Sequence, residues 1–235
     1  MSVSRIRDNP PPPSKQGSTT GRRYAGVDPQ ERQRLRRAKL IDAALAVFGA
    51  KGYHQATVRD VCKAAQLTSR YFYESFEGME SLFRAVYSQV NRQLMESTVE
   101  VLSRCPSDIH AMTEAALRNF LAFIRDDPRR ARVMLIDALN VGEGMYSLAN
   151  QINQDFAELI AGYLQQFMPN LAGSGLDAQV LSDGLVGAAN RIATQWVGRR
   201  CQASLEVILT NSLALFEATI EYAGHKSGTP LTIRT

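Results

Sequence analysis

The stretch Thr57–Leu82 reads TVRDVCKAAQLTSRYFYESFEGMESL, and it decides how the chain is interpreted. Its first four residues, Thr57–Asp60, resemble a capping box, because a threonine is followed three residues later by an acidic residue, and they predict a helix start. Gln66–Leu67 predicts a turn, and Thr68 predicts the start of a second helix that runs through Tyr73. Two short helices joined by a tight turn, the second basic and aromatic, are typical of a DNA-binding motif.

In a helix-turn-helix the second helix enters the major groove of DNA, and the first helix braces it. Close approach of the two helices requires small or branched residues on the facing side. The first helix supplies four of them, Val61, Cys62, Ala64 and Ala65. Leu67 is expected to fill the turn, and Phe72 and Phe76 to lie beneath the second helix. The outer face would carry the groups that meet DNA: Ser69, Arg70, Tyr71 and Tyr73.

The charge of the chain is concentrated around this motif. Residues 1–79 hold 14 Lys and Arg against 7 Asp and Glu, whereas residues 80–235 hold 13 against 16. A basic first third on a mildly acidic remainder indicates that one end meets a polyanion. Because basic terminal tails are common, the asymmetry is informative mainly where it coincides with the motif.

Composition is that of an ordinary globular protein. The chain has 235 residues, 45% hydrophobic and 21% charged, which is enough for a sizeable core. No apolar run approaches the roughly 18 residues that span a bilayer, and residues 1–23 lack the apolar stretch of a signal peptide. We therefore expect a cytoplasmic protein without membrane contact. Three widely spaced cysteines and three scattered histidines predict neither a disulfide framework nor a metal site, and no cofactor is expected.

The chain divides into a short arm and two helical parts. Residues 1–30 are rich in Pro, Ser, Gly and Thr, so we expect a disordered basic arm, whose arginines either follow DNA phosphates or stay solvated. From Glu31 onward the apolar spacing is helical, as in the first helix: Leu35, Ala38, Ile41, Leu45 and Phe48. Lys51-Gly52 ends that helix. Beyond the motif, helices are expected over about 78–104, 108–126, 129–140, 144–167, 177–200 and 204–223.

No alternating apolar run suggests a strand. The predicted fold class is therefore all-α, with about nine helices. A helix-turn-helix domain would occupy residues 31–80, and a larger helical domain would occupy residues 81–235.

The segment from about Arg34 to Val90 resembles the N-terminal domain of the TetR family of transcriptional regulators. The pattern of that family runs Thr-Val-x-x-Ile-Ala-x-x-Ala-Gly-Val-Ser, then Gly two residues on, then Leu-Tyr-x-x-Phe and Lys-Glu-x-Leu. The chain matches it at Thr57, Val58, Ala65, Phe72 (for Leu), Tyr73, Phe76, Glu80 and Leu82, and conservatively at Val61, Leu67 and Thr68. The resemblance implies a DNA-binding regulator and not an enzyme.

Departures from the pattern carry their own predictions. Gln66 replaces the turn glycine, which costs on the order of 1 kcal/mol if the backbone there is left-handed. Arg70 replaces a glycine of the reading helix, and arginine to guanine O6 and N7 is the commonest specific contact with DNA. We hypothesise that Arg70 reads a guanine and that Tyr71 packs against a thymine methyl or a sugar edge. Met79 replaces a lysine that usually touches phosphate in the family, and Arg59 or Arg84 is a candidate replacement.

The full set of predicted DNA-contacting residues is Thr57, Arg59, Thr68, Ser69, Arg70, Tyr71 and Tyr73. The resemblance assigns Thr57 and Tyr73 to phosphates, which position the protein without specifying sequence. The alternatives stay open: Thr57 as a plain helix cap, the two tyrosines as part of a small core, and Arg70 as a solvated charge.

The resemblance also makes residues 81–235 an effector-binding and dimerisation domain. The last two helices would form a four-helix interface with a second copy of the chain, and two reading helices would then lie about 34 Å apart on a palindromic operator. An unidentified small-molecule effector would bind among the middle helices. The candidate lining residues are Phe120, Phe123, Met134, Phe156, Arg191 and Trp196, although aromatic and methionine side chains also build ordinary cores.

These observations favour a dimeric, ligand-responsive transcriptional regulator, a repressor that a small molecule releases from double-stranded DNA. The alternative is a helical enzyme or small-molecule carrier in which the helix-turn-helix is incidental, and a third possibility is an adaptor that acts through helix pairing. Salt-sensitive binding to a palindrome distinguishes the first from the others.

Overall fold

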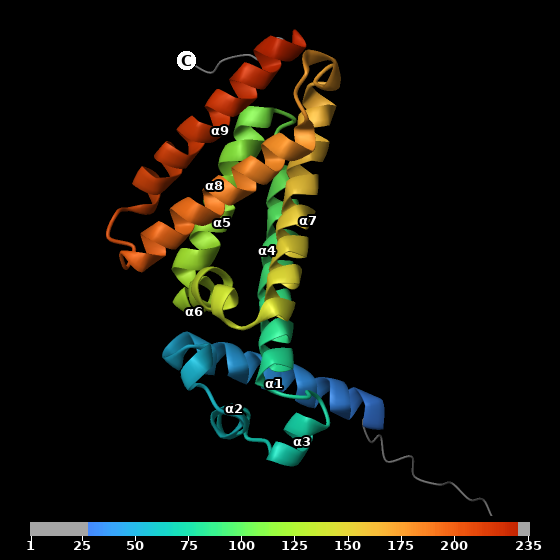
Figure 1. Cartoon of the computed structure of the whole chain (residues 1–235), viewed down its shortest axis with the longest axis vertical. Coiled ribbons are helices and arrows are strands. Elements are labelled where there is room, and N and C mark those ends of the chain that lie inside the picture. Colours follow the sequence, from blue (N-terminus) through green and yellow to red (C-terminus); the bar gives the residue numbers. More distant parts are fainter. Residues whose placement is uncertain (1–27, 230–235) are drawn as a thin grey trace, which may run out of the picture.

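The structure, a computed structural model, describes residues 28–229, and every regular element in that range is helical (Figure 1). The elements in chain order are α1 (Pro29–Lys51), η1 (Tyr53–Gln55), α2 (Val58–Ala65), α3 (Ser69–Tyr73), α4 (Met79–Arg104), α5 (Ile109–Asp126), α6 (Pro128–Ala131), η2 (Arg132–Ile136), η3 (Asp137–Asn140), α7 (Glu143–Phe167), η4 (Ala172–Ser174), α8 (Ala178–Gly198) and α9 (Leu205–Ser227). The predicted all-α class is confirmed within residues 28–229. The predicted arm lies, up to residue 27, outside the described residues.

Helix α1 begins where Asp28 accepts a hydrogen bond from the backbone of Gln30 and Pro29 occupies the first turn. It ends at Gly52, whose φ of 81° favours glycine. The buried face is shorter than the predicted stripe. It starts only at Leu40 and includes Ile41, Ala44 and Phe48, whereas Leu35 and Ala38 are exposed. The prediction was wrong for these two residues because the first turns of α1 extend past the helices beneath it.

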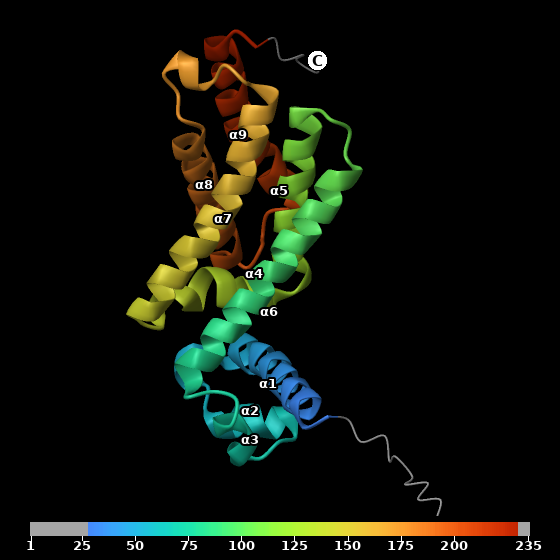
Figure 2. The same ribbon diagram turned by 90° about the vertical axis from the view of Figure 1, so that its right-hand side faces the viewer.

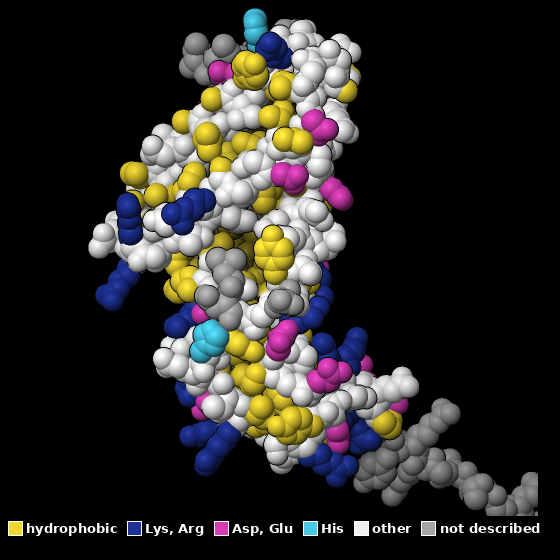
Figure 3. Space-filling model, in the orientation of Figure 1, with side chains coloured by type: hydrophobic (Ala, Val, Ile, Leu, Met, Phe, Trp, Pro, Cys, Tyr) yellow, Lys and Arg dark blue, Asp and Glu magenta, His cyan; other side chains and the backbone are white. Residues whose placement is uncertain are grey.

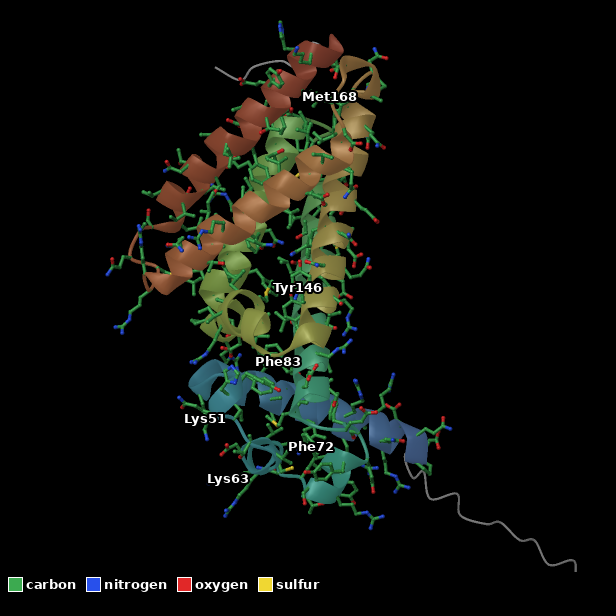
Figure 4. The ribbon with its side chains drawn as sticks, viewed as in Figure 1. Lys51, Lys63, Phe72, Phe83, Tyr146 and Met168 are labelled. Carbon is green, nitrogen blue, oxygen red and sulfur yellow. The ribbon has the colours of Figure 1, made fainter. Side chains whose placement is uncertain are left out.

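Helices α1, α2 and α3 form a small N-terminal domain at one end of the molecule (Figure 1). Its core contains Val61, Cys62 and Ala65 from α2 and Phe72 and Phe76 from the α3 region. In Figure 4 the labelled Phe72 lies toward α1, whereas Lys63 projects from α2 into solvent. The predicted inner face is therefore confirmed except at Ala64, which is exposed because it lies on the side of α2 away from the core.

Helix α4 connects this domain to the C-terminal domain, a bundle of α4, α5, α7, α8 and α9 (Figure 2). Phe83 near the start of α4 is fully buried and packs edge-on against Phe48 of α1, with ring centroids 5.1 Å apart. At the far end of the bundle a second core cluster gathers around Leu164, Met168 and Ile220. Helix α4 belongs to the first cluster, which extends from α1 into the bundle as far as Leu185 and Phe216.

The single helix predicted over residues 129–140 is wrong. That segment consists of α6, the π-helix η2 and the 3-10 helix η3. Three consecutive residues, Val133, Met134 and Leu135, are all buried. Successive residues of an α-helix point 100° apart, so the segment buries all three within a wider π turn. Within residues 28–229, no helix is long and apolar enough to cross a membrane.

Candidate DNA-binding surface and ligand pocket

Helix α2 starts in a complete capping box, as the sequence predicts. The Thr57 hydroxyl accepts a hydrogen bond from the Asp60 backbone N–H at 3.2 Å, and the Asp60 carboxylate accepts one from the Thr57 backbone N–H at 3.1 Å. Lys51 lies 2.9 Å from the same carboxylate. Its ammonium, together with the Thr57 hydroxyl, lowers the pKa of Asp60 to about 2. Thr57 therefore caps the helix, and it is also exposed to solvent.

The turn of the motif is left-handed at a residue that is not glycine. Gln66 has φ 53° and ψ 42°, and its N–H donates to the carbonyl of Lys63 at 3.2 Å. The Leu67 N–H donates to the carbonyl of Cys62 at 3.0 Å, which completes the helix end. The backbone at Gln66 is therefore left-handed, which is the case in which the sequence predicts a cost of about 1 kcal/mol for a residue other than glycine.

Helix α3 exposes most of the predicted reading residues. Thr68, Ser69, Arg70 and Tyr73 are exposed, and 63% of the Tyr73 side chain is open to solvent. Thr68 is the N-cap of this helix, so the predicted helix start is confirmed, but its side chain makes no cap hydrogen bond. Its hydroxyl is therefore not engaged by its own helix.

Tyr71 lies differently from its neighbours on α3. It is half-buried, and the guanidinium of Arg36 on α1 lies 4.4 Å from the centre of its ring. The ring is therefore partly covered by α1, which leaves less of it for DNA than the sequence suggested.

A carboxylate holds the exposed arginine of α3. Arg70 Nε donates to Glu74 Oε1 at 2.9 Å, and Arg36 Nη2 lies 3.9 Å from Glu74 Oε2. The Glu74 carboxylate therefore bridges the reading helix and α1. Sequence reasoning did not identify Glu74, although the spacing of four residues between Arg70 and Glu74 is the ordinary one for a helical ion pair.

Basic side chains surround this end of the molecule. Figure 3 shows Lys and Arg at the edges of the surface formed by α1, α2 and α3. Arg59 of α2 is exposed. Arg84 lies elsewhere: a Cβ added to Gly144 at the start of α7 would be 2.9 Å from its Nη1. Of the two candidates to replace the missing lysine at Met79, only Arg59 belongs to the motif.

The N-terminal domain is joined to the C-terminal domain by a hydrogen bond that could not be predicted from the sequence. The Tyr53 N–H, just after α1, donates to Asp137 Oδ2 of η3 at 3.0 Å across 84 residues. Asp137 is buried, and Arg132 Nε lies 3.6 Å from the same oxygen. A Cβ at Gly52 would collide with the Arg132 guanidinium, so the end of α1 and η2 are in close contact.

A pocket runs through the C-terminal domain between α4, α5, α7, α8 and α9. Its lining is mostly apolar and includes three predicted residues: Phe120, Met134 and Phe156. Among polar lining residues are Asn91 of α4, Asn153 of α7 and Asn190 of α8. Sequence reasoning did not identify Asn91 or Asn153, because a lone asparagine in a helix carries no recognisable pattern.

The other three predicted pocket residues lie elsewhere. Arg191 and Trp196 line a separate hollow between the end of α8 and the start of α9, where the Trp196 Nε1–H donates to the carbonyl of Ala203 at 2.9 Å. Phe123 lines neither hollow, and the Arg130 guanidinium lies 4.2 Å from the centre of its ring. The structure therefore brings half of the predicted set together.

Known proteins resemble this chain in sequence and in fold. The profile of the family described as "Bacterial regulatory proteins, tetR family" matches residues 40–86. The HTH-type transcriptional regulator YdgC of Bacillus subtilis is 24% identical over 183 residues, which cover 75% of this chain and 90% of the relative.

Two solved structures have the same fold over most of their length. The fatty acid degradation regulator FadR from Bacillus halodurans has a TM-score of 0.68 at 18% identity, covering 81% of this chain and 95% of that one. FadR from Bacillus subtilis in complex with stearoyl-CoA has a TM-score of 0.65 at 19% identity, covering 79% and 96%. The capped, left-handed turn motif at residues 57–73 lies within the segment 40–86 that matches the family of bacterial regulatory proteins of the tetR type, and the chain shares its fold with these two regulators.

Proposed function

We propose that the protein is a homodimeric repressor that binds a palindromic operator and is released when an effector with a long apolar chain enters the pocket. The observation that carries this proposal is the exposed, basic α3 surface joined through α1 and Asp137 to an apolar pocket. A protein of this kind acts in the cytoplasm, where chromosomal DNA lies, and needs no catalytic activity.

Arg70 is proposed to read a guanine. Its side chain is 84% exposed, and Glu74 engages only its Nε, so both terminal nitrogens are free to form the bidentate contact with O6 and N7. Thr57, Arg59, Thr68, Ser69 and Tyr73 are proposed to contact phosphates around it, because they are exposed on the same motif.

Selection of bound sequences from a random double-stranded DNA library tests this reading. Wild-type protein should enrich an inverted repeat with a fixed guanine in each half-site, and its affinity should fall steeply with salt. Arg70→Ala should relax the preference at that one position and leave the spacing of the half-sites unchanged. An identical base preference in the variant would refute the role of Arg70, and salt-insensitive binding without a palindrome would refute the proposed function.

Dimerisation is supported by the outer faces of the last two helices. Val207, Leu215 and Tyr222 of α9 are 52%, 44% and 55% exposed, and their spacing of eight and seven residues puts them on one side of the helix. On α8, Val180 is 68% exposed, and no atom lies within 4 Å of a Cβ added at Gly184 or Gly187. Figure 3 shows apolar side chains scattered over this face. A second copy of the same helices would cover these apolar residues. Gly184 and Gly187 of α8 would allow the helices of the two copies to approach closely.

Sedimentation velocity tests the dimer directly. Leu215→Glu should convert the wild-type dimer to a monomer, whereas Val99→Glu, an equally exposed apolar site on α4, should leave it dimeric. A monomeric wild type, or a dimer that survives Leu215→Glu together with Tyr222→Glu, would refute this interface.

The proposed effector class rests on the pocket lining and on the fold shared with a regulator solved with stearoyl-CoA. Long acyl compounds should therefore lower the affinity of the protein for its selected operator. The test is fluorescence anisotropy of labelled operator DNA with increasing tetradecanoyl-CoA. Unchanged DNA affinity at saturating ligand would refute the effector proposal while leaving the DNA-binding reading intact.

A further inference from the structure

The polar groups of the pocket are neutral amides and hydroxyls. Among the described residues that line it, none carries a Lys, Arg, His, Asp or Glu side chain. The hydroxyls of Thr98 and Thr113 donate to carbonyls of their own helices at 2.8 Å and 2.7 Å. Asn91 Nδ2 likewise donates to the Tyr87 carbonyl at 2.9 Å. These three bonds stay within α4 and α5, and Asn91 keeps its second N–H and its carbonyl.

Asn153 and Asn190 instead bond to each other, between two different helices. Asn190 Nδ2 donates to Asn153 Oδ1 at 3.1 Å, which links α7 to α8 inside the pocket. An amide offers two N–H donors and one carbonyl acceptor. After this mutual bond, the Asn153 amide keeps both N–H donors, and Asn190 keeps one N–H and its carbonyl. The pair therefore has hydrogen-bonding capacity left for a ligand.

This pair lies at one end of the pocket. Asn153 is the first lining residue along α7, and Asn190 is the last along α8. Met134 of η2 also lines the pocket and is three residues from Asp137, which contacts the N-terminal domain. Helix α4 rises from the N-terminal domain and α8 descends toward it (Figures 1 and 2). The amide pair is therefore at the end of the pocket that faces the N-terminal domain.

Away from the pair the pocket is long and mostly apolar, and its polar lining residues there are Asn91, Thr98, Thr113 and Tyr163. The lining runs from Asn153 to Phe167 on α7 and from Asn91 to Leu102 on α4. At 1.5 Å per helical residue these stretches are about 21 Å and 16 Å long. An extended chain of single bonds advances about 1.2 Å per bond, so the pocket matches a hydrocarbon chain of roughly 13–17 bonds.

We propose that the pocket selects a neutral carbonyl compound of this chain length, such as an ester or a thioester, and discriminates against the free carboxylate. The ligand carbonyl would accept a hydrogen bond from the Asn153–Asn190 pair, and the chain would extend toward Phe167. A buried carboxylate without a cationic partner keeps a large desolvation cost that neutral donors offset only in part. Any charged head group joined through a thioester must lie outside this lining.

This inference deepens the proposed function and rests on it. The test uses isothermal titration calorimetry of full-length protein at pH 8 with three C14 compounds: tetradecanoate, its methyl ester and tetradecanoyl-CoA. The ester and the thioester should bind at least about tenfold more tightly than tetradecanoate, because only the acid places a charge among neutral groups. Equal or tighter binding of tetradecanoate would overturn the inference and leave the acyl-effector proposal standing. If none of the three compounds binds, the effector proposal itself fails.

Matched variants test whether Asn153 and Asn190 cause the preference for an ester over a carboxylate. Asn153→Leu and Asn190→Leu should each weaken ester binding by about five- to tenfold, the value of one hydrogen bond. Asn150→Leu, one turn earlier on α7 and exposed, is the control and should bind as wild type does. Asn190→Lys supplies the missing cation, so tetradecanoate should then bind more tightly than the ester. An unchanged order of affinities in a folded Asn190→Lys protein would overturn the role of the pair.

Discussion

Replacing Asp137 with alanine should weaken the connection between the two domains. The change removes the acceptor of the Tyr53 N–H, at 3.0 Å, and the anion beside Arg132 Nε, at 3.6 Å. A hydrogen bond to a charged acceptor contributes about 1.5–3 kcal/mol. Because Asp137 is buried, solvent screens this contact little. We therefore expect Asp137→Ala to lower the free energy of unfolding by about 2–3 kcal/mol, and Asp137→Asn, which keeps one acceptor oxygen, by about half as much.

Urea unfolding followed by circular dichroism measures this loss at a fixed protein concentration, because a dimer is stabilised by mass action. With a slope of about 2 kcal/mol per molar urea, the midpoint should fall by about 1 M. Asp126→Ala is the control, since Asp126 is exposed and pairs with its neighbour Arg125. A midpoint that is the same for Asp137→Ala and Asp126→Ala would refute the reasoning.

Three further changes follow from local geometry. Gln66→Gly should raise the free energy of unfolding by up to about 1 kcal/mol, because glycine adopts φ 53° without strain; a lower urea midpoint would contradict this. The lowered pKa of Asp60 means that its stabilising contribution is present above its ordinary pKa of 3.8 and is lost as pH falls toward 2. Asp60→Asn should therefore flatten the dependence of stability on pH between about pH 4 and pH 2, and an unaltered acid limb would count against the capping box as its cause. Glu74→Ala frees the Arg70 side chain, so the guanine preference in DNA selection should weaken while Glu74→Gln retains most of it; equal preferences in both variants and wild type would rule out this positioning role.

The N-terminal domain could be predicted from the sequence because its signals are local. The capping box at Thr57, the left-handed position at Gln66 and the buried Phe72 each depend on residues a few positions apart. The contact between α1 and α3 within this domain could not be predicted from the sequence. Tyr71 is partly covered by Arg36, 35 residues earlier in the chain, and no spacing rule identifies such a pair.

The connection between the domains and the pocket was harder to predict for the same reason. Residues 129–140 contain neither a glycine nor a proline, so a continuous helix was the natural expectation. Burial of three consecutive side chains, which depends on the surrounding helices, breaks that helix at η2. The Asn153–Asn190 bond likewise joins two helices across 37 residues. Tertiary packing decides both features.

The position of η2 suggests how the pocket and the DNA-binding surface are coupled. Met134 of η2 lines the pocket, Arg132 of the same turn contacts the end of α1, and Asp137 follows directly and binds the Tyr53 N–H. π turns occur frequently at functional sites, and this one lies between the pocket and the end of α1. A Cβ added at Gly49 of α1 would lie 2.5 Å from Arg129 Cβ and 3.0 Å from Arg129 Cα, so α6, which leads directly into η2, packs closely against α1. A ligand that displaces Met134 would therefore move the end of α1, and α2 and α3 would move with it because they share its core.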